Sequence, residues 1–86
     1  MHVRVRLVGS LVRRGGREVE ITLPDDSVVG DLLREISETY PYLGGLDPTK
    51  GILVVVDGVE AGNLQGLNTP LADGVDVALV PVTHGG

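Results

Sequence analysis

Residues 26–41 read DSVVGDLLREISETYP, and their spacing predicts the helix on which the rest of the fold packs. Large side chains recur at intervals of three and four residues, which places them on one face of an α-helix. They are Val29, Leu32, Leu33, Ile36 and Tyr40. Asp26 or Ser27 is expected to cap the first turn, and Pro41 disfavours helical geometry at Tyr40, so the helix should end nearby. A helix with one apolar face needs a second layer to cover it.

Strand patterns lie on both sides of this helix. Residues 2–8 and 17–23 alternate apolar and polar side chains, which is typical of half-buried strands. They form the arms of an antiparallel hairpin, with GSLVRRGG between them as a flexible turn region. Residues 52–56 are apolar on both faces and precede Asp57-Gly58, a strong hairpin-turn signal. A short strand is expected within residues 63–67 and the last strand at 75–80, before Pro81.

This order of elements predicts an α+β fold of the β-grasp (ubiquitin-like) class. The sheet is expected to be mixed, with four to five strands and one main helix packed across one face. The first and last strands are then central neighbours, and the last strand delivers the C-terminus directly off the sheet. We assign residues 1–82 to this β-grasp domain and residues 83–86 to a flexible C-terminal tail ending in Gly-Gly.

The composition argues against several classes of function. The chain of 86 residues has no cysteine, which excludes disulfides, thiolate metal sites and cysteine nucleophiles. Its net charge of −5 argues against direct nucleic-acid binding, and Arg13, Arg14 and Arg17 are interpreted as a solvated hairpin end. No segment approaches the roughly 20 continuous apolar residues that span a membrane. We therefore expect a cytoplasmic protein. His2 and His84 alone make a poor zinc site, so no metal is expected.

Residues on two of the predicted strands are apolar on both faces. We assign to the helix side Val54, Val56, Val77 and Leu79. The opposite face then carries Leu53, Val55, Ala78 and Val80. No element of this short chain is left to cover that face, and an exposed apolar patch commonly marks a binding surface. We predict a partner patch there, with the alternative that a shift of one residue exchanges the two sets.

The sequence ends in Thr83-His84-Gly85-Gly86, directly after the apolar last strand. A frayed terminus is one explanation, because chain ends are often poorly ordered. The alternative is that the terminal carboxylate is the working group. Glycine has no Cβ and permits a close approach of backbone to another surface. The position of the pair, after the last strand of a predicted β-grasp, favours the second explanation.

Three segments in order resemble a known family: VVGDLLREISETYP, ILVVVDGVE and TPLADGVDVALVPVTHGG. They resemble the MoaD/ThiS sulfur-carrier family, which includes the small subunit of molybdopterin synthase. The sequence is also similar to ubiquitin-related modifiers and small archaeal modifier proteins. The most specific pieces are Leu71-Ala72-Asp73-Gly74, the apolar last strand and the terminal Gly85-Gly86.

The resemblance implies that an E1-like enzyme adenylates the carboxylate of Gly86, using ATP and magnesium that the partner binds and this chain does not. A thiocarboxylate would then donate sulfur in molybdopterin biosynthesis or tRNA thiolation. The next partner would be the molybdopterin synthase large subunit or a tRNA-thiolation enzyme. The resemblance also implies an alternative, a protein modifier conjugated through Gly86 to target lysines. A third possibility is a non-covalent interaction module.

In the first two cases the chain is the substrate of an enzyme and is not itself an enzyme, although it could serve as the small subunit of molybdopterin synthase. Gly85, His84 and Thr83 would present the tail.

Overall fold

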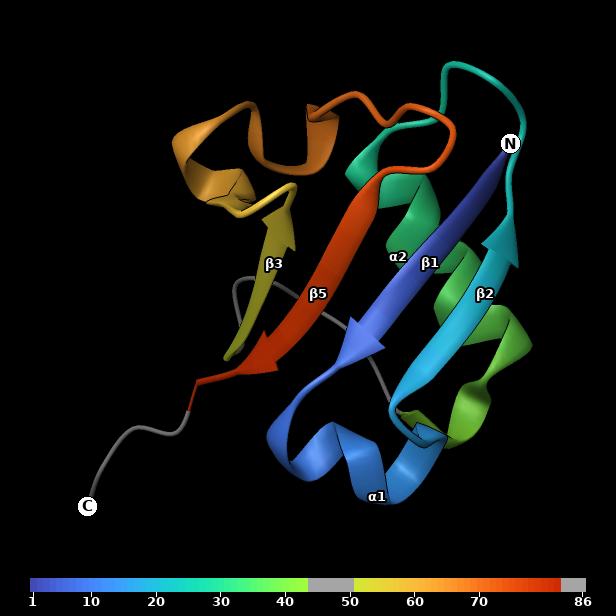
Figure 1. Cartoon of the computed structure of the whole chain (residues 1–86), viewed down its shortest axis with the longest axis vertical. Helices are drawn as coiled ribbons and strands as arrows, with labels where there is room; N and C mark the ends of the chain where they lie inside the picture. Colours follow the sequence, from blue (N-terminus) through green and yellow to red (C-terminus); the bar gives the residue numbers. More distant parts are fainter. Residues whose placement is uncertain (44–50, 83–86) are drawn as a thin grey trace.

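The computed structural model describes residues 1–43 and 51–82, without the side chains of residues 14 and 15. Within these residues a five-stranded mixed sheet is formed (Figure 1). Its strands are β1 (His2–Leu7), β2 (Glu18–Thr22), β3 (Ile52–Val56), β4 (Val59–Glu60) and β5 (Asp76–Pro81). Their order in the sheet is β2-β1-β5-β3-β4. β1 is parallel to β5, whereas β1–β2, β3–β5 and β3–β4 are antiparallel. The predicted fold class and the central pairing of first and last strands are confirmed.

Helix α2 (Val29–Thr39) lies across one face of this sheet (Figure 1). The helix side chains Val29, Leu32, Leu33 and Ile36 are buried, as their spacing predicted, and Tyr40 is half-buried at the end of the helix. Opposite them, Val54, Val56, Val77 and Leu79 are buried on the inner face of the sheet. The assignment of these four residues to the helix side is therefore confirmed. A 3₁₀ turn, η2 (Pro41–Leu43), follows the helix.

The expected cap of α2 was wrong, because the N-cap residue is Val28 and neither Asp26 nor Ser27. The Ser27 hydroxyl instead donates to the Pro24 carbonyl, at 2.7 Å. The N–H of Val28 donates to Asp31 Oδ2, at 2.9 Å, and the N–H of Val29 donates to the Thr69 carbonyl, at 3.0 Å. The free N–H groups at the start of α2 are thus paired with an acidic side chain within the helix and with a carbonyl that is distant in the sequence.

The connection between β1 and β2 also differs from the expected flexible turn. It contains a 3₁₀ turn, η1 (Gly9–Leu11), and a short helix, α1 (Val12–Gly15). Leu11 is buried in the main core and anchors this segment. A single helical turn carries no repeated apolar spacing, so periodicity could not reveal it.

The expected strand within residues 63–67 was wrong as well. The short strand is β4, which starts directly after the Asp57-Gly58 turn. Two 3₁₀ turns follow it, η3 (Ala61–Asn63) and η4 (Gly66–Asn68). Gly66 has a φ of +58°, which is incompatible with an extended strand.

The hairpin turn between β3 and β4 is confirmed, with φ of +48° at Asp57 and +83° at Gly58. Nothing lies within 4 Å of a Cβ placed on Gly58, so a substitution there acts only through backbone conformation. We expect Gly58→Val to destabilise the fold by about 1–2 kcal/mol, because β-branched residues avoid positive φ. Gly58→Asn should cost less, since Asn tolerates this region. Urea unfolding of both variants tests this, and equal losses would contradict a conformational cause.

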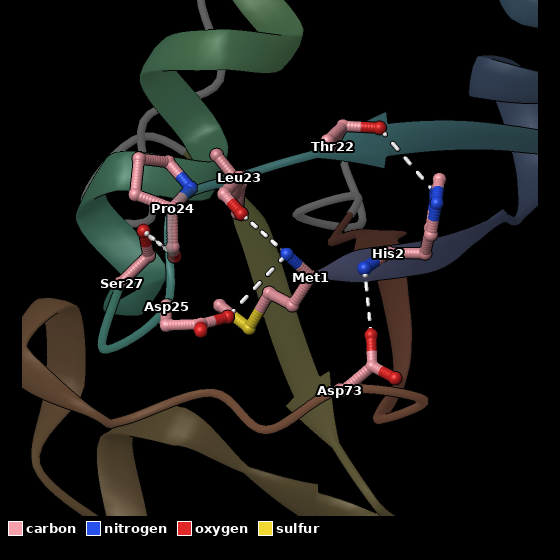
Figure 2. Close-up of polar contacts among 8 residues, drawn as sticks. All are labelled: Met1, His2, Thr22, Leu23, Pro24, Asp25, Ser27 and Asp73. Carbon is pink, nitrogen blue, oxygen red and sulfur yellow. Dashed lines mark hydrogen bonds and ion pairs between the residues drawn. The ribbon is translucent and has the colours of Figure 1, made fainter.

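The start of β1 is tied to two other segments (Figure 2). The Met1 nitrogen donates to the Leu23 carbonyl at 2.6 Å and lies 3.6 Å from the Asp25 carboxylate. The N–H of His2 donates to Asp73 Oδ1, at 2.8 Å. These contacts join the beginning of β1 to the end of β2 and to the turn that precedes β5.

Candidate functional site

The last described residues fix the base of the predicted tail. The N–H of Val82 donates to the Gly51 carbonyl, at 2.7 Å, so pairing with the β3 side continues one residue beyond β5. The ring of Pro81 lies against Gly9, where an added Cβ would be 3.4 Å from Pro81 Cγ. The tail residues Thr83, His84, Gly85 and Gly86 lie outside the described residues. Their predicted roles stay predictions, and the structure defines only the point from which the tail departs.

The outer face of the sheet carries the predicted partner patch beside this point. Leu53 pairs with Val80 and Val55 pairs with Ala78 across β3 and β5. Leu53 is 36% exposed, and Val55 and Val80 are half-buried. The inclusion of Ala78 needs correction, because it is only 6% exposed. Its small side chain lies between Val55 and Arg6 on the neighbouring strands and offers almost no contact area.

Two further residues enlarge the patch. Val8 follows β1 and Val82 follows β5, and strand alternation places both on the outer face. Both are exposed. We use the term apolar patch for these residues: Val8, Leu53, Val55, Val80 and Val82. The sequence signal for Val8 and Val82 was the continuation of the alternating pattern past the strand ends.

The other half of the outer face is charged and internally paired. Arg6 donates to Asp76 through two nitrogens, at 3.1 and 2.8 Å. Arg4 pairs with Glu18 at 2.8 Å and lies 4.0 Å from Glu20. Exposed ion pairs such as these contribute little to stability, about 0–1 kcal/mol each. Because these charged side chains are already paired with one another, the apolar patch is the part of this face that is available for a partner. It lies next to the base of the tail.

Residues 1–43 and 51–82 contain no group of side chains suited to a metal site and no buried polar side chain without a partner. No three metal-ligating side chains there are grouped closely enough to hold an ion. The two buried polar residues of this part are both satisfied. Ser27 donates as described above, and the Thr69 hydroxyl donates to the Gly66 carbonyl and accepts from the N–H of Gln65. None of the helices in this part is long and apolar enough to cross a bilayer.

Comparison with known proteins agrees with this geometry. The model of the ThiS family matches residues 5–86, nearly the whole chain. The chain belongs to the ThiS family. This places it among the sulfur-carrier and ubiquitin-like proteins that its sequence resembles.

Similar solved structures cover between 94% and 100% of this ThiS-family chain. SAMP1 from Haloferax volcanii is 26% identical, with a TM-score of 0.83 and all of both chains covered. The Haloferax volcanii HVO 2177 protein is 28% identical, with a TM-score of 0.83 over all of this chain and 87% of that chain. CysO from Mycobacterium tuberculosis is 21% identical, with a TM-score of 0.72 over 94% of this chain and 99% of that chain, and shows the shared fold. A comparison with curated protein sequences gave no match.

Proposed function

We propose that this chain is a sulfur carrier whose Gly86 carboxylate is adenylated by an E1-like enzyme and converted to a thiocarboxylate. The match to the ThiS family, which runs to the last glycine, is the observation that carries the proposal. A carboxylate is a poor electrophile, so the oxygen must first become part of a leaving group. The carboxylate oxygen attacks the α-phosphate of ATP, and pyrophosphate leaves. A sulfur nucleophile then attacks the acyl carbon, and AMP leaves as the C–S bond forms.

In this proposal the chain itself only presents the Gly86 carboxylate. The partner binds ATP and magnesium and provides the cationic groups that stabilise the developing charge. Gly85 and Gly86 have no side chains to collide with the walls of a narrow site. Thr83 and His84 would lie at its mouth. The base of the tail is held at Val82 and the apolar patch adjoins it, so one partner surface can engage both.

The proposed acceptors of the sulfur are a molybdopterin precursor and a tRNA base. The corresponding partners are the large subunit of molybdopterin synthase and a tRNA-thiolation enzyme. Both acceptors would take sulfur from the same thiocarboxylate at Gly86.

A second candidate is a ubiquitin-like modifier, and a specific observation favours it. SAMP1 from Haloferax volcanii, the similar structure described above, is named a small archaeal modifier protein. In this case the amine of a target lysine attacks the activated acyl carbon of Gly86, and AMP, or the thiol of a thioester formed on the partner, leaves as the isopeptide bond forms. The non-covalent interaction module remains as the third candidate and needs no activated tail.

The intact mass of the protein tests these proposals. The chain is incubated with ATP, magnesium, a sulfide source and the E1-like enzyme of the same organism. Exchange of one oxygen for one sulfur is expected. Higher-mass adducts in cell lysate, with Gly-Gly remnants on lysines, would instead support the modifier. A protein of unchanged mass in both experiments would leave only the interaction module.

The apolar patch provides a separate prediction. Leu53→Glu is expected to raise the carrier concentration that half-saturates ATP–pyrophosphate exchange by about 30-fold, equivalent to ~2 kcal/mol at an interface hot spot. Val59→Glu is the matched control, because Val59 is similarly exposed (43%) but pairs with the inward-facing Val56 and so lies on the opposite face of the sheet from Leu53. Equal effects of the two substitutions would contradict a role for the patch.

A further inference from the structure

The structure brings two unpaired arginines and the two tyrosines of the chain to one corner. We use the term arginine–tyrosine corner for Arg13, Arg17, Tyr40 and Tyr42. Three other arginines in the described part take part in ion pairs, namely Arg4, Arg6 and Arg34. Arg13 and Arg17 are exposed and form no ion pair with any described residue. In a chain with a net charge of −5, two unpaired cations in one place are unusual.

The tyrosines give this corner an aromatic surface. Tyr40 and Tyr42 meet edge to face, with ring centroids 5.9 Å apart. Tyr40 packs against the core, and its hydroxyl donates to the Glu20 carbonyl, at 3.4 Å. Tyr42 is 56% exposed and is the largest exposed hydrophobic side chain of the described residues. One ring is therefore a fixed support, and the other is available for contact.

The corner has a defined position relative to the tail. α1 carries Arg13 and contacts η2, which carries Tyr42. Both segments are anchored by buried leucines: Leu11 directly precedes α1, and Leu43 is the last residue of η2. η1 precedes α1 and contacts β5. Because β1 and β5 are parallel, α1 and the end of β5 lie at the same end of the molecule (Figure 1). The base of the tail, η1, α1 and η2 thus follow one another along this end.

We infer that the arginine–tyrosine corner is a second contact for the partner that activates the tail, and that it binds carboxylates on that partner's surface; this inference rests on the proposed function. Arg and Tyr are enriched among residues that dominate binding energy at protein interfaces. The exposed Tyr42 ring would cover an apolar side chain beside those carboxylates. Complementary charge at such a place raises the association rate and selects the partner.

The observations favour a protein over a nucleic acid at this corner. Nucleic-acid binding draws its affinity from many phosphate contacts. Two unpaired guanidinium groups in an acidic chain supply few such contacts, and the other arginines whose side chains the structure describes, Arg4, Arg6 and Arg34, are already engaged. A partner with two or three carboxylates matches the number of cations that the structure offers.

The test is a charge reversal with a matched control. R13E/R17E should raise the half-saturating carrier concentration in ATP–pyrophosphate exchange about tenfold, with the maximal rate unchanged, because a binding contact is lost and the chemistry is not. The single variants R13E and R17E should each raise this concentration severalfold, whereas R34E, which makes the same charge change on α2 away from the corner, should change it less than twofold. Tyr42→Ala should raise it severalfold. Raising the salt from about 50 to about 500 mM should weaken the wild type more than R13E/R17E.

The outcomes separate this inference from the proposed function. If the wild type supports no exchange, the proposed function is overturned, and the inference with it. If the wild type supports exchange and R13E/R17E has an unchanged half-saturating concentration, the inference alone is overturned. Binding of a labelled oligouridylate by the wild type and not by R13E/R17E would assign the corner to a nucleic acid and also overturn the inference. Urea unfolding of each variant confirms that the fold is intact.

Discussion

A chain that lacks Gly85 and Gly86 is expected to lose activation altogether while remaining folded. Two extended residues span about 7 Å, so the carboxylate of the shortened chain would stop that far from the reacting phosphate. Even a misplacement of about 1 Å can reduce a rate by about 100-fold. ATP–pyrophosphate exchange should therefore fall by at least about 100-fold. The deletion removes only residues beyond Val82, so the described contacts of the domain stay in place.

The control for this deletion is a variant that keeps the tail length. His84→Ala leaves both glycines and the position of the carboxylate unchanged, so exchange should stay within a few-fold of the wild type. The truncated protein should still compete with the wild type for the partner through the apolar patch. Exchange at the wild-type rate by the truncated chain would show that the terminal carboxylate is not the working group.

Leu79→Ala is expected to remove a large part of the stability of the domain. Leu79 is fully buried in β5, where it pairs with Leu7 of β1 and Val54 of β3. Truncation of a buried leucine costs about 2–5 kcal/mol, because contacts are lost and a cavity remains. A domain of 86 residues has a free energy of unfolding of only about 4–13 kcal/mol. A large part of the population should therefore unfold under mild denaturant.

Urea unfolding followed by circular dichroism measures this loss. Leu67→Ala is the matched control, because it removes the same atoms from a residue that is exposed on η4. We expect a change below about 1 kcal/mol for the control. Similar losses in both variants would contradict the central position of Leu79 in the core.

The regular part of the fold could be predicted from the sequence because apolar residues recur at a characteristic spacing in each helix and strand. The helix face appeared at spacings of three and four, and strand alternation placed Val54 and Leu79 on the buried side. The turn at Asp57-Gly58 was predictable because two successive residues with positive φ have a narrow choice of amino acids. These signals are local, so tertiary structure did not override them.

The errors fall where tertiary contacts decide the local structure. The first turn of α2 is satisfied by the Thr69 carbonyl, which lies 40 residues away in the sequence and left no mark near Val29. α1 is too short to show a period, and it is held in place by the burial of Leu11. At the candidate site, alternation placed Leu53 and Val80 on the outer face but could not show that neighbouring strands cover Ala78.

The arginine–tyrosine corner was unpredictable for a related reason. The sequence shows Arg13 and Arg17 as a charged loop, and it does not show that η2 brings Tyr42 next to α1. It also cannot show which arginines find carboxylates. Arg6 pairs with Asp76, 70 residues away, and the local sequence around Arg6 carries no sign of that pair.

The parallel pairing of β1 with β5 has a consequence for biosynthesis. The middle of the sheet joins β1 to β5, more than 60 residues later in the chain, so this pairing cannot form during synthesis until β5 has emerged from the ribosome. Contacts between such distant segments form slowly, because a long loop must close first. Until β5 is available, β1 and β3 each lack their partner in the middle of the sheet, although β1 can already pair with β2. A translation product that stops before β5 lacks Val80 and Val82 of the apolar patch, so under the proposed function it would not present this face to a partner.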